Sequence, residues 1–258
     1  MPQKIHSTAI IEPGAQLADD VQVGAQAYIG KYVKIESGSI VMHHATVDGD
    51  TSIGISNIIH PYTYLGGPTQ DLKYDGGKPR LLIGNGNVFR EFFTVHTATR
   101  SDDATVIGNN NTFLAYAHVA HDCLLGNGII MSSHAALGGH VAVGDHANIG
   151  WSSGVHQFCR IGQYAMLSAM AKATMDVPPY MIADGIPART RTFNRVNLER
   201  NGFSEQEIYT IKEIYMALYM QPQVREEALA RLRKISTGSG DLYDNVCSFF
   251  KSSCRGVC

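Results

Sequence analysis

An apolar residue recurs at every sixth position through most of the first 173 residues. The frame starts at Ile5 and ends at Ala173, and the positions that interrupt it are Asp71, Gly77 and Ser101. A period of six fits neither the 3.6-residue repeat of a helix nor the simple alternation of a long strand. It fits a short strand followed by a tight corner, so that three hexads close one triangular coil of about 18 residues. The pattern therefore predicts a mainly β protein, a parallel β-helix whose coils stack through strand pairing.

Small residues occupy the positions that such corners require. Glycine often follows the apolar position, as at Gly24 and Gly30, and alanine often stands four places after it, as at Ala15 and Ala27. The chain has 26 glycines in 258 residues, above the ordinary ~7%, and 17% charged residues, below the ordinary ~25%. Both deviations favour a turn-rich repetitive β architecture over a helical bundle.

The composition excludes several classes of protein. A formal net charge of -2, from 21 Lys+Arg against 23 Asp+Glu, gives no basic footprint for nucleic acid. No apolar run reaches the roughly 20 residues that cross a bilayer, so we expect no stable membrane insertion. The first residues lack the apolar core of a secretory signal. Five cysteines without a CxxC pair argue against a disulfide scaffold or a structural zinc site, and favour a cytoplasmic protein.

Two internal segments and the C-terminal part depart from the hexad pattern. Residues 66–82 and 96–106 carry no hexads, and long loops on a repetitive scaffold are usually functional. We expect a β-helix over residues 1–192 and a small α-helical domain over residues 193–258.

The helix signals of the C-terminal part are local. A first helix is expected to stop at Gly202, and a second to begin with a capping box from Ser204 to Glu207. Further helical stretches are expected after Pro222 and Asp241. The apolar stripe of the second helix consists of Ile208, Ile211, Ile214, Tyr215 and Leu218.

Histidines concentrate in the second half of the predicted β-helix. Residues 18 apart lie in one column on adjacent coils, so positions can be stacked by arithmetic. The columns place proton-transfer groups beside backbone N–H groups that no side chain shields. The strip so formed consists of His121, Asp122, His140, His156 and Gln157 around the pair Gly138 and Gly139.

Three interpretations of this strip are open. Polar side chains occur on the outer face of any solenoid, and a single residue such as His134 or His146 needs no other explanation. Metal binding is a second interpretation, because γ-type carbonic anhydrases hold zinc on a β-helix, although their paired histidines are five apart and His118 and His121 are three apart. The third is acid–base catalysis, in which a carboxylate orients a histidine that takes a hydroxyl proton. A bare glycine N–H would then hold the oxyanion of an acyl transfer.

Several segments resemble one enzyme family over essentially the whole chain. They are AHVAHDC (117–123), LGGHVAVG (137–144), VHQFCRIG (155–162), DVPPY (176–180) and QDLKY (70–74). In this order and at these spacings they are similar to UDP-N-acetylglucosamine acyltransferases, the first enzymes of lipid A assembly. The resemblance implies a left-handed β-helix and homotrimers with active sites between neighbouring subunits. It also implies transfer of a 3-hydroxyacyl chain from acyl carrier protein to the 3-hydroxyl of UDP-N-acetylglucosamine, without metal or cofactor.

Carried over residue by residue, the resemblance assigns roles to the strip. It makes His121 the general base, Asp122 the group that orients it, and the Gly139 N–H the oxyanion donor. Asp71 and Lys73 of the QDLKY loop are expected to reach the site of a partner subunit, with Asp71 at the sugar. The residues expected to line the site are His118, His140, His156 and Gln157.

The nucleotide end departs from the family pattern. The family has an asparagine, followed on the first C-terminal helix by two consecutive arginines before Gly-Phe. Here Asn194 and Arg200 match as nucleotide-binding residues, while Asn201 stands where the second arginine is expected. The resemblance therefore predicts one phosphate-facing charge fewer than in the family.

The resemblance also points to the residues that set acyl-chain length. In the family, glycine 13 places after the histidine of VHQF admits a long tail, and methionine there admits a short one. Ala169, followed by Met170, occupies this position after His156. We therefore expect a preference between the two extremes.

Rival functions remain open. The N-acyltransferase that acts later in the same pathway would need an N-terminal uridine-binding domain, whereas hexads begin here at Ile5. An amine-accepting variant of the first enzyme would use the same base and oxyanion hole. A non-catalytic β-helix scaffold would tolerate scrambling of the His121 strip.

Overall fold

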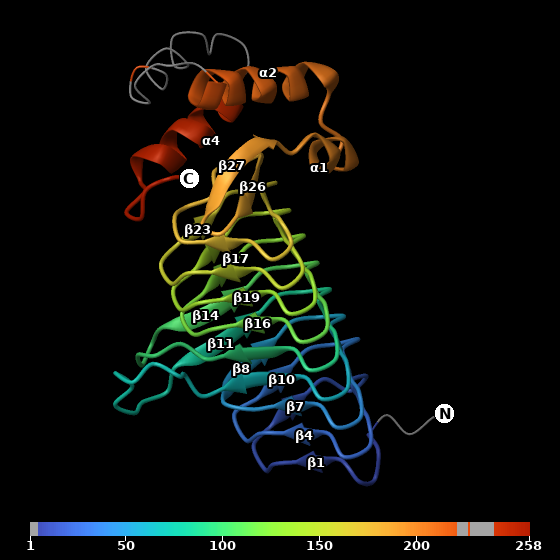
Figure 1. Cartoon of the computed structure of the whole chain (residues 1–258). Helices are drawn as coiled ribbons and strands as arrows, with labels where there is room; N and C mark the ends of the chain where they lie inside the picture. The colour runs from blue at the N-terminus through green and yellow to red at the C-terminus, as the bar shows by residue number, and fades with distance from the viewer. Residues whose placement is uncertain (1–4, 221–226, 228–239) are drawn as a thin grey trace.

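The computed structural model describes residues 5–220, 227 and 240–258. Strands of mostly two residues wind into a three-sided column, with the C-terminal helices at one end (Figure 1). Strands that follow one another along the chain lie in different sheets, and each sheet collects every third strand. The predicted mainly β class, with a parallel β-helix and a small helical part, is therefore confirmed.

The three sheets form the three sides of the column. The first sheet consists of β1 (Ile10–Ile11), β4 (Tyr28–Ile29), β7 (Thr46–Val47), β10 (Tyr64–Gly67), β13 (Thr94–His96), β16 (His118–Val119), β19 (Ala136–Leu137), β22 (Gly154–Val155) and β25 (Lys172–Ala173). The second consists of β2 (Gln16–Leu17), β5 (Lys34–Ile35), β8 (Asp50–Ile53), β11 (Arg80–Ile83), β14 (Ala104–Ile107), β17 (Leu124–Leu125), β20 (Ala142–Val143) and β23 (Arg160–Ile161). The third consists of β3 (Gln22–Val23), β6 (Ile40–Val41), β9 (Ile58–Ile59), β12 (Val88–Phe89), β15 (Thr112–Phe113), β18 (Ile130–Met131), β21 (Asn148–Ile149), β24 (Met166–Leu167), β26 (Met181–Gly185) and β27 (Ala188–Phe193).

The apolar position of each hexad lies inside the column. Ile29, Leu65, Phe113 and Leu167 are fully buried. Ile5 is 39% exposed because its coil is the first of the stack and has no complete coil beneath it. The period of six in the sequence is thus the period of the hydrophobic core.

The strand register explains why the hexad frame survives two interruptions. Paired residues are 18 apart on most coils, as for His118 and Ala136. They are 30 apart between β10 and β13, from Tyr64 to Thr94, and 24 apart between β13 and β16, from Thr94 to His118. The two loops therefore add 12 and 6 residues to a coil. Both numbers are multiples of six, so the frame resumes in phase.

The non-repetitive loops are shorter than the sequence predicts. The expected segments were 66–82 and 96–106, but strands occupy both ends of each, and the connecting residues are 68–79 and 97–103. The reason is that β8, β11 and β14 are four residues long and pair with one another along their lengths. This additional pairing extends regular structure beyond the apolar hexad positions.

The corners stack as regularly as the strands. The second residue of each corner on the His121 column has a left-handed backbone, with φ of 61° at Asp122, 59° at His140 and 65° at Phe158. Its N–H donates to the carbonyl of the first corner residue one coil earlier, from His140 to His121 and from Phe158 to Gly139, each at 3.0 Å. Residues 18 apart therefore lie next to one another, as the column arithmetic predicts.

The helical part packs on the last coil. β26 is parallel to β24 and forms an antiparallel hairpin with β27. The elements that follow are α1 (Arg195–Arg200), α2 (Glu205–Tyr215), the π-helical turn η1 (Met216–Met220) and α4 (Gly240–Lys251). A second hydrophobic cluster joins the end of the column to these helices, and among its members are Tyr180, Met181, Leu198, Ile211 and Val246.

Most of the predicted helix signals are confirmed. Gly202 follows α1 with a φ of +80°, and Ser204 and Glu207 form the capping box of α2. The stretch after Asp241 is part of α4, whereas the stretch after Pro222 lies outside the described residues. No helix in the described part of the chain has the length and apolar character needed to span a membrane.

Candidate active site

His121 and Asp122 form a closely bonded pair at the corner between β16 and β17. Nδ1 of His121 lies 2.7 Å from Oδ2 of Asp122, and the two side chains are only 13% and 9% exposed. Burial disfavours the charged carboxyl group, but hydrogen bonds from His121 and Thr99 outweigh it and hold the pKa of Asp122 below its ordinary value. Asp122 is therefore a carboxylate that accepts hydrogen bonds.

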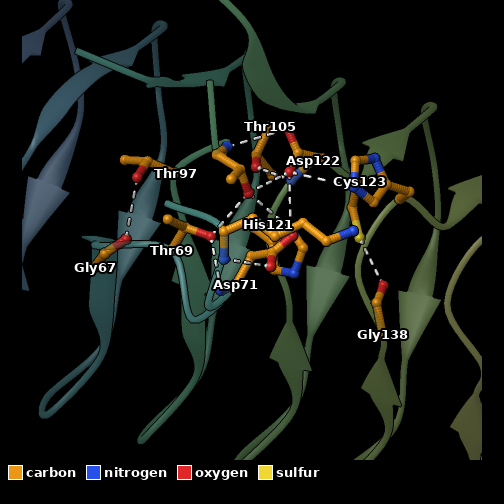
Figure 2. Close-up of polar contacts among 12 residues, drawn as sticks. Gly67, Thr69, Asp71, Thr97, Thr105, His121, Asp122, Cys123 and Gly138 are labelled. Carbon is orange, nitrogen blue, oxygen red and sulfur yellow. Dashed lines mark hydrogen bonds and ion pairs between the residues drawn. The ribbon is translucent and has the colours of Figure 1, made fainter. Parts of the chain in front are cut away.

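Three threonines lie around this pair, and Figure 2 labels two of them, Thr69 and Thr105. The Thr99 hydroxyl donates to Oδ2 of Asp122 at 2.7 Å, and the N–H of Asp122 donates to the Thr105 hydroxyl at 2.8 Å. Thr69 lies 2.9 Å from the Thr99 hydroxyl. Sequence reasoning missed all three, because they lie in the two segments without hexads, where residues cannot be assigned to columns.

Gly139 lies directly beneath the His121 ring. A Cβ atom at residue 139 would overlap the imidazole, so the close packing requires glycine. Within the described residues, no hydrogen bond uses the N–H of Gly139. The predicted adjacency of His121 and Gly139 is confirmed, and it leaves a bare backbone donor beside the histidine.

The loop between β10 and β11 folds over this corner. One donor atom each of Asp71, His121 and His140 lie within 4.8 Å of one another. Oδ1 of Asp71 accepts a hydrogen bond of 2.9 Å from the N–H of Lys73, which shapes the loop locally. Asp71 therefore lies beside His121 and His140 of its own chain, and its role at the sugar in a partner subunit's site stays a prediction.

A polar cleft of about 970 Å³ opens between this loop and the corner column. Phe158, missed by sequence reasoning, lines it with its ring stacked on His140 at a centroid distance of 4.7 Å. The predicted site residues that line this cleft are Asp71, Lys73, His121, Asp122, His140 and Gln157.

A second cleft, about 530 Å³ and mainly apolar, lies on the outer face of the first sheet. The predicted residues His118, His156 and Met170 line it together with small or aliphatic groups, and Ala169 is exposed beside Met170 without lining it. Gly138 lines this apolar cleft, and the next residue, Gly139, lies against the ring of His121, which lines the polar cleft. The Gly138–Gly139 peptide therefore connects the apolar cleft to His121.

His118, which lines the apolar cleft, is neutral near pH 7. Its Nδ1 lies 2.8 Å from the Thr94 hydroxyl, and its ring meets the buried His96 edge-on at a centroid distance of 5.0 Å. Burial, followed by the neighbouring His96 and His121, lowers the pKa of His118 to about 4. Burial of its own ring, followed by the neighbouring His121, lowers the pKa of His96.

We expect the stability of the protein to fall between pH 6.5 and pH 4 partly through His118. In this window the unfolded chain binds a proton at His118 and the folded chain does not, so folding becomes less favourable as pH falls. His118→Gln removes the titrating group. Urea unfolding at pH 7 and pH 4.5 should therefore show a smaller loss of stability in the variant than in the wild type, and an equal loss would contradict the assignment.

The predicted nucleotide-binding residues lie away from the polar cleft. Asn194 is buried, and its amide donates to the carbonyl of Tyr164 at 2.9 Å, while Arg200 is exposed in the last turn of α1. Neither lines the polar cleft of this chain. Asn201, which replaces the family's second arginine, donates to the carbonyl of Asn197 at 2.8 Å.

The possible metal ligands that the structure brings together differ from those that the sequence suggested. The sequence suggested His118 with His121, whereas among the described residues the group that can offer donor atoms to one ion is Asp71, His121 and His140. Two imidazoles and a carboxylate suit a divalent transition metal. Nδ1 of His121 is bonded to Asp122, so only its Nε2 would be available to an ion.

Fold and site together define a class of protein. The hexad coils carry a histidine–aspartate pair beside a bare glycine N–H. A polar cleft and an apolar cleft lie next to this pair. This is the arrangement of a hexapeptide-repeat acyltransferase.

Comparison with known proteins identifies the family within that class. The family model described as Udp N-acetylglucosamine O-acyltransferase, Domain 2, matches residues 176–258. The acyl-[acyl-carrier-protein]–UDP-N-acetylglucosamine O-acyltransferase of Paraburkholderia xenovorans is 42% identical over 258 residues, covering 98% of each chain. The solved UDP-N-acetylglucosamine O-acyltransferase of Moraxella catarrhalis superposes with a TM-score of 0.94 at 34% identity, covering 99% of each chain. The UDP-N-acetylglucosamine acyltransferase of Campylobacter jejuni superposes with a TM-score of 0.92 at 34% identity, covering 98% of each chain. The chain belongs to the family of acyl-[acyl-carrier-protein]–UDP-N-acetylglucosamine O-acyltransferases.

Proposed function

We propose that the protein transfers a 3-hydroxyacyl chain from acyl carrier protein to the 3-hydroxyl of UDP-N-acetylglucosamine, the first step of lipid A biosynthesis, with His121 as general base. The observation that carries the proposal is the His121–Asp122 pair, facing a polar cleft beside the unused N–H of Gly139. Five cysteines without a CxxC pair are typical of a reducing compartment, so we place the activity in the cytoplasm.

The mechanism follows from the position of the protons. With Nδ1–H of His121 bonded to Asp122, Nε2 carries the lone pair and takes the proton of the 3-hydroxyl. The sugar oxygen attacks the thioester carbonyl, and the N–H of Gly139 donates to the oxyanion that forms. When the tetrahedral intermediate collapses, the C–S bond breaks and the imidazolium returns its proton to the departing thiolate. No metal or cofactor takes part in these steps.

The two clefts suggest where each substrate lies. Asp71, Lys73, His140 and Gln157 offer hydrogen bonds to a sugar in the polar cleft. The apolar cleft, with His118 and His156 at its polar edge, suits the acyl chain. The acyl carbonyl would then lie near the Gly138–Gly139 peptide, within reach of the base.

The decisive test is an acyl-transfer assay with UDP-N-acetylglucosamine and a panel of 3-hydroxyacyl carrier-protein thioesters, before and after dialysis against EDTA. We expect turnover that EDTA leaves unchanged and a product acylated at the 3-position. Turnover only with a 3-amino sugar nucleotide would favour the amine-accepting alternative. Loss of turnover on EDTA treatment would favour a metal at Asp71, His121 and His140, and no turnover with any acceptor would favour a scaffold.

We further propose that the protein works as a homotrimer. Asn194 and Arg200, assigned to the nucleotide, do not line the polar cleft of their own chain, so they would have to act in the cleft of another subunit. Equilibrium sedimentation should give a mass near three times 28.1 kDa. A catalytically competent monomer would contradict the shared site.

Acyl-chain preference should respond to residue 169. Each additional buried CH₂ contributes about 0.8 kcal/mol, whereas forcing it against a packed wall costs about 1–3 kcal/mol. The resulting difference in binding free energy, between a chain that fits and one that is too long, corresponds to a preference of roughly tenfold to several hundredfold. We expect Ala169→Gly to shift the preference toward longer chains and Ala169→Met toward shorter ones in competition assays with mixed donors. If neither substitution shifts it, Met170, which lines the apolar cleft, is the next candidate.

A further inference from the structure

Thr99 contacts the His121–Asp122 pair through both its hydroxyl and its backbone N–H. The residue is 7% exposed, and its hydroxyl lies 2.7 Å from Oδ2 of Asp122, 3.1 Å from Nδ1 of His121 and 2.9 Å from the hydroxyl of Thr69. Its backbone N–H lies 3.2 Å from Oδ1 of the same carboxylate. Both oxygens of Asp122 are therefore held by one residue from the loop between β13 and β14.

The number of available protons fixes the direction of these hydrogen bonds. An ionised carboxylate only accepts, so the single hydroxyl proton of Thr99 is donated to Asp122. The Thr99 oxygen can then only accept from its other neighbours, which makes Thr69 the donor to Thr99. The proton on Nδ1 of His121 likewise points to Asp122, with the Thr99 oxygen as a second acceptor. This arrangement leaves Nε2 of His121 without a proton.

The same chain of hydroxyl groups reaches the loop that carries Asp71. The Thr69 oxygen accepts the backbone N–H of Asp71 at 3.1 Å, so the bonds run from Asp71 through Thr69 and Thr99 to Asp122. Thr69 and Asp71, which Figure 2 labels, lie on the loop after β10, and Thr99 lies on the loop after β13. The two loops added to the β-helix are thus connected to each other by the hydrogen bond between Thr69 and Thr99, next to His121.

We propose that Thr99 is a positioning residue for the His121–Asp122 pair, and that Thr69 and Thr99 together couple the loop carrying Asp71 to the base. The inference rests on the proposed function. Thr99 does not touch the reacting atoms; it holds the Asp122 carboxylate in the orientation that keeps His121 in its Nδ1–H tautomer. Without the hydroxyl, the negative charge of Asp122 has one donor fewer and acts more strongly on His121.

The test compares Thr99→Val, which keeps the shape and removes the hydroxyl, with Thr99→Ser, which keeps the hydroxyl. We expect Thr99→Val to lower kcat by about 10-fold to 100-fold, the size of a lost hydrogen bond to a charged group. We also expect the acidic limb of its kcat/KM profile to move to higher pH, because a carboxylate with one donor fewer interacts more strongly with the positive charge that His121 carries after it takes a proton. Thr99→Ser should restore both quantities to within about threefold. Thr112→Val, on the outer face of β15 in the third sheet, is the matched control.

Thr69→Val tests the coupling. Its effect on kcat should vanish in the Thr99→Val background, because it acts through Thr99, while an increased KM for the sugar nucleotide should remain, because the Asp71 loop loses its anchor. Independent, multiplicative effects on kcat would overturn the coupling. Wild-type kcat in Thr99→Val, or an unshifted pH profile with no rescue by serine, would overturn the positioning role.

Wild type and His121→Ala, measured in the same assays, separate these failures from failure of the proposed function. No turnover by the wild type would refute the function itself. An active wild type, an inactive His121→Ala and a fully active Thr99→Val would refute only the inference about Thr99.

Discussion

Replacing His121 with alanine is expected to lower kcat by about 10²–10⁴, the usual contribution of a general base. The His121 imidazole lines the polar cleft and its Nδ1 is bonded to a carboxylate, which leaves Nε2 to take a proton. KM for UDP-N-acetylglucosamine should change much less, because Asp71, His140 and Gln157, which line the cleft and which we propose bind the sugar, remain in place. Steady-state kinetics over the pH range 6 to 9 measures both quantities.

A matched control separates catalysis from folding. His134 stands on another corner column of the same coil stack, where its ring stacks on Tyr116 at 4.9 Å. His134→Ala should leave kcat within about twofold of the wild type, and both variants should keep the wild-type circular dichroism spectrum and sedimentation behaviour. Full activity in a folded His121→Ala would refute the mechanism.

The fold could be predicted because its rule is local. Each hexad repeats the same sequence of strand, corner and inward apolar residue, so a period read from the sequence gives the coil length and the columns. His121 and Gly139, 18 apart, are adjacent for this reason. The period does not give the sense of the winding, because a left-handed and a right-handed coil have the same length. The handedness therefore had to come from resemblance.

The parts of the site that could not be predicted lie where the rule stops. Thr69, Thr99 and Asp71 belong to the two loops, and their positions depend on how 12 and 6 added residues fold over the column. Column arithmetic assigns them no place. It also could not show that Asp71 returns to its own chain, or that Asn194 and Arg200 lie off the cleft, because those residues are placed by packing between the last coil and α1.

Asp122→Asn is expected to lower kcat as much as His121→Ala does, although it replaces one oxygen atom by an NH₂ group. Oδ1 of the carboxylate accepts the backbone N–H of Thr99, which can only donate, so an asparagine keeps its oxygen at this position. Its NH₂ group then replaces Oδ2, which the Thr99 hydroxyl and Nδ1 of His121 both contact, and the hydroxyl can rotate to accept. An NH₂ donor requires an acceptor at Nδ1, which moves the ring proton to Nε2. The base then has no lone pair for the substrate, and kcat should fall by about 10²–10⁴.

Asp122→Ala separates this tautomer effect from simple loss of charge. Without any group at Oδ2, Nδ1–H of His121 can still donate to the Thr99 hydroxyl 3.1 Å away, so Nε2 keeps its lone pair. We therefore expect Asp122→Ala to be about tenfold more active than Asp122→Asn, the reverse of the order expected from conservation of shape. Nitrogen-15 chemical shifts of His121 in the two variants report the tautomer directly. If the asparagine variant is the more active, or if both rings carry the proton on Nδ1, Asp122 acts through its charge alone.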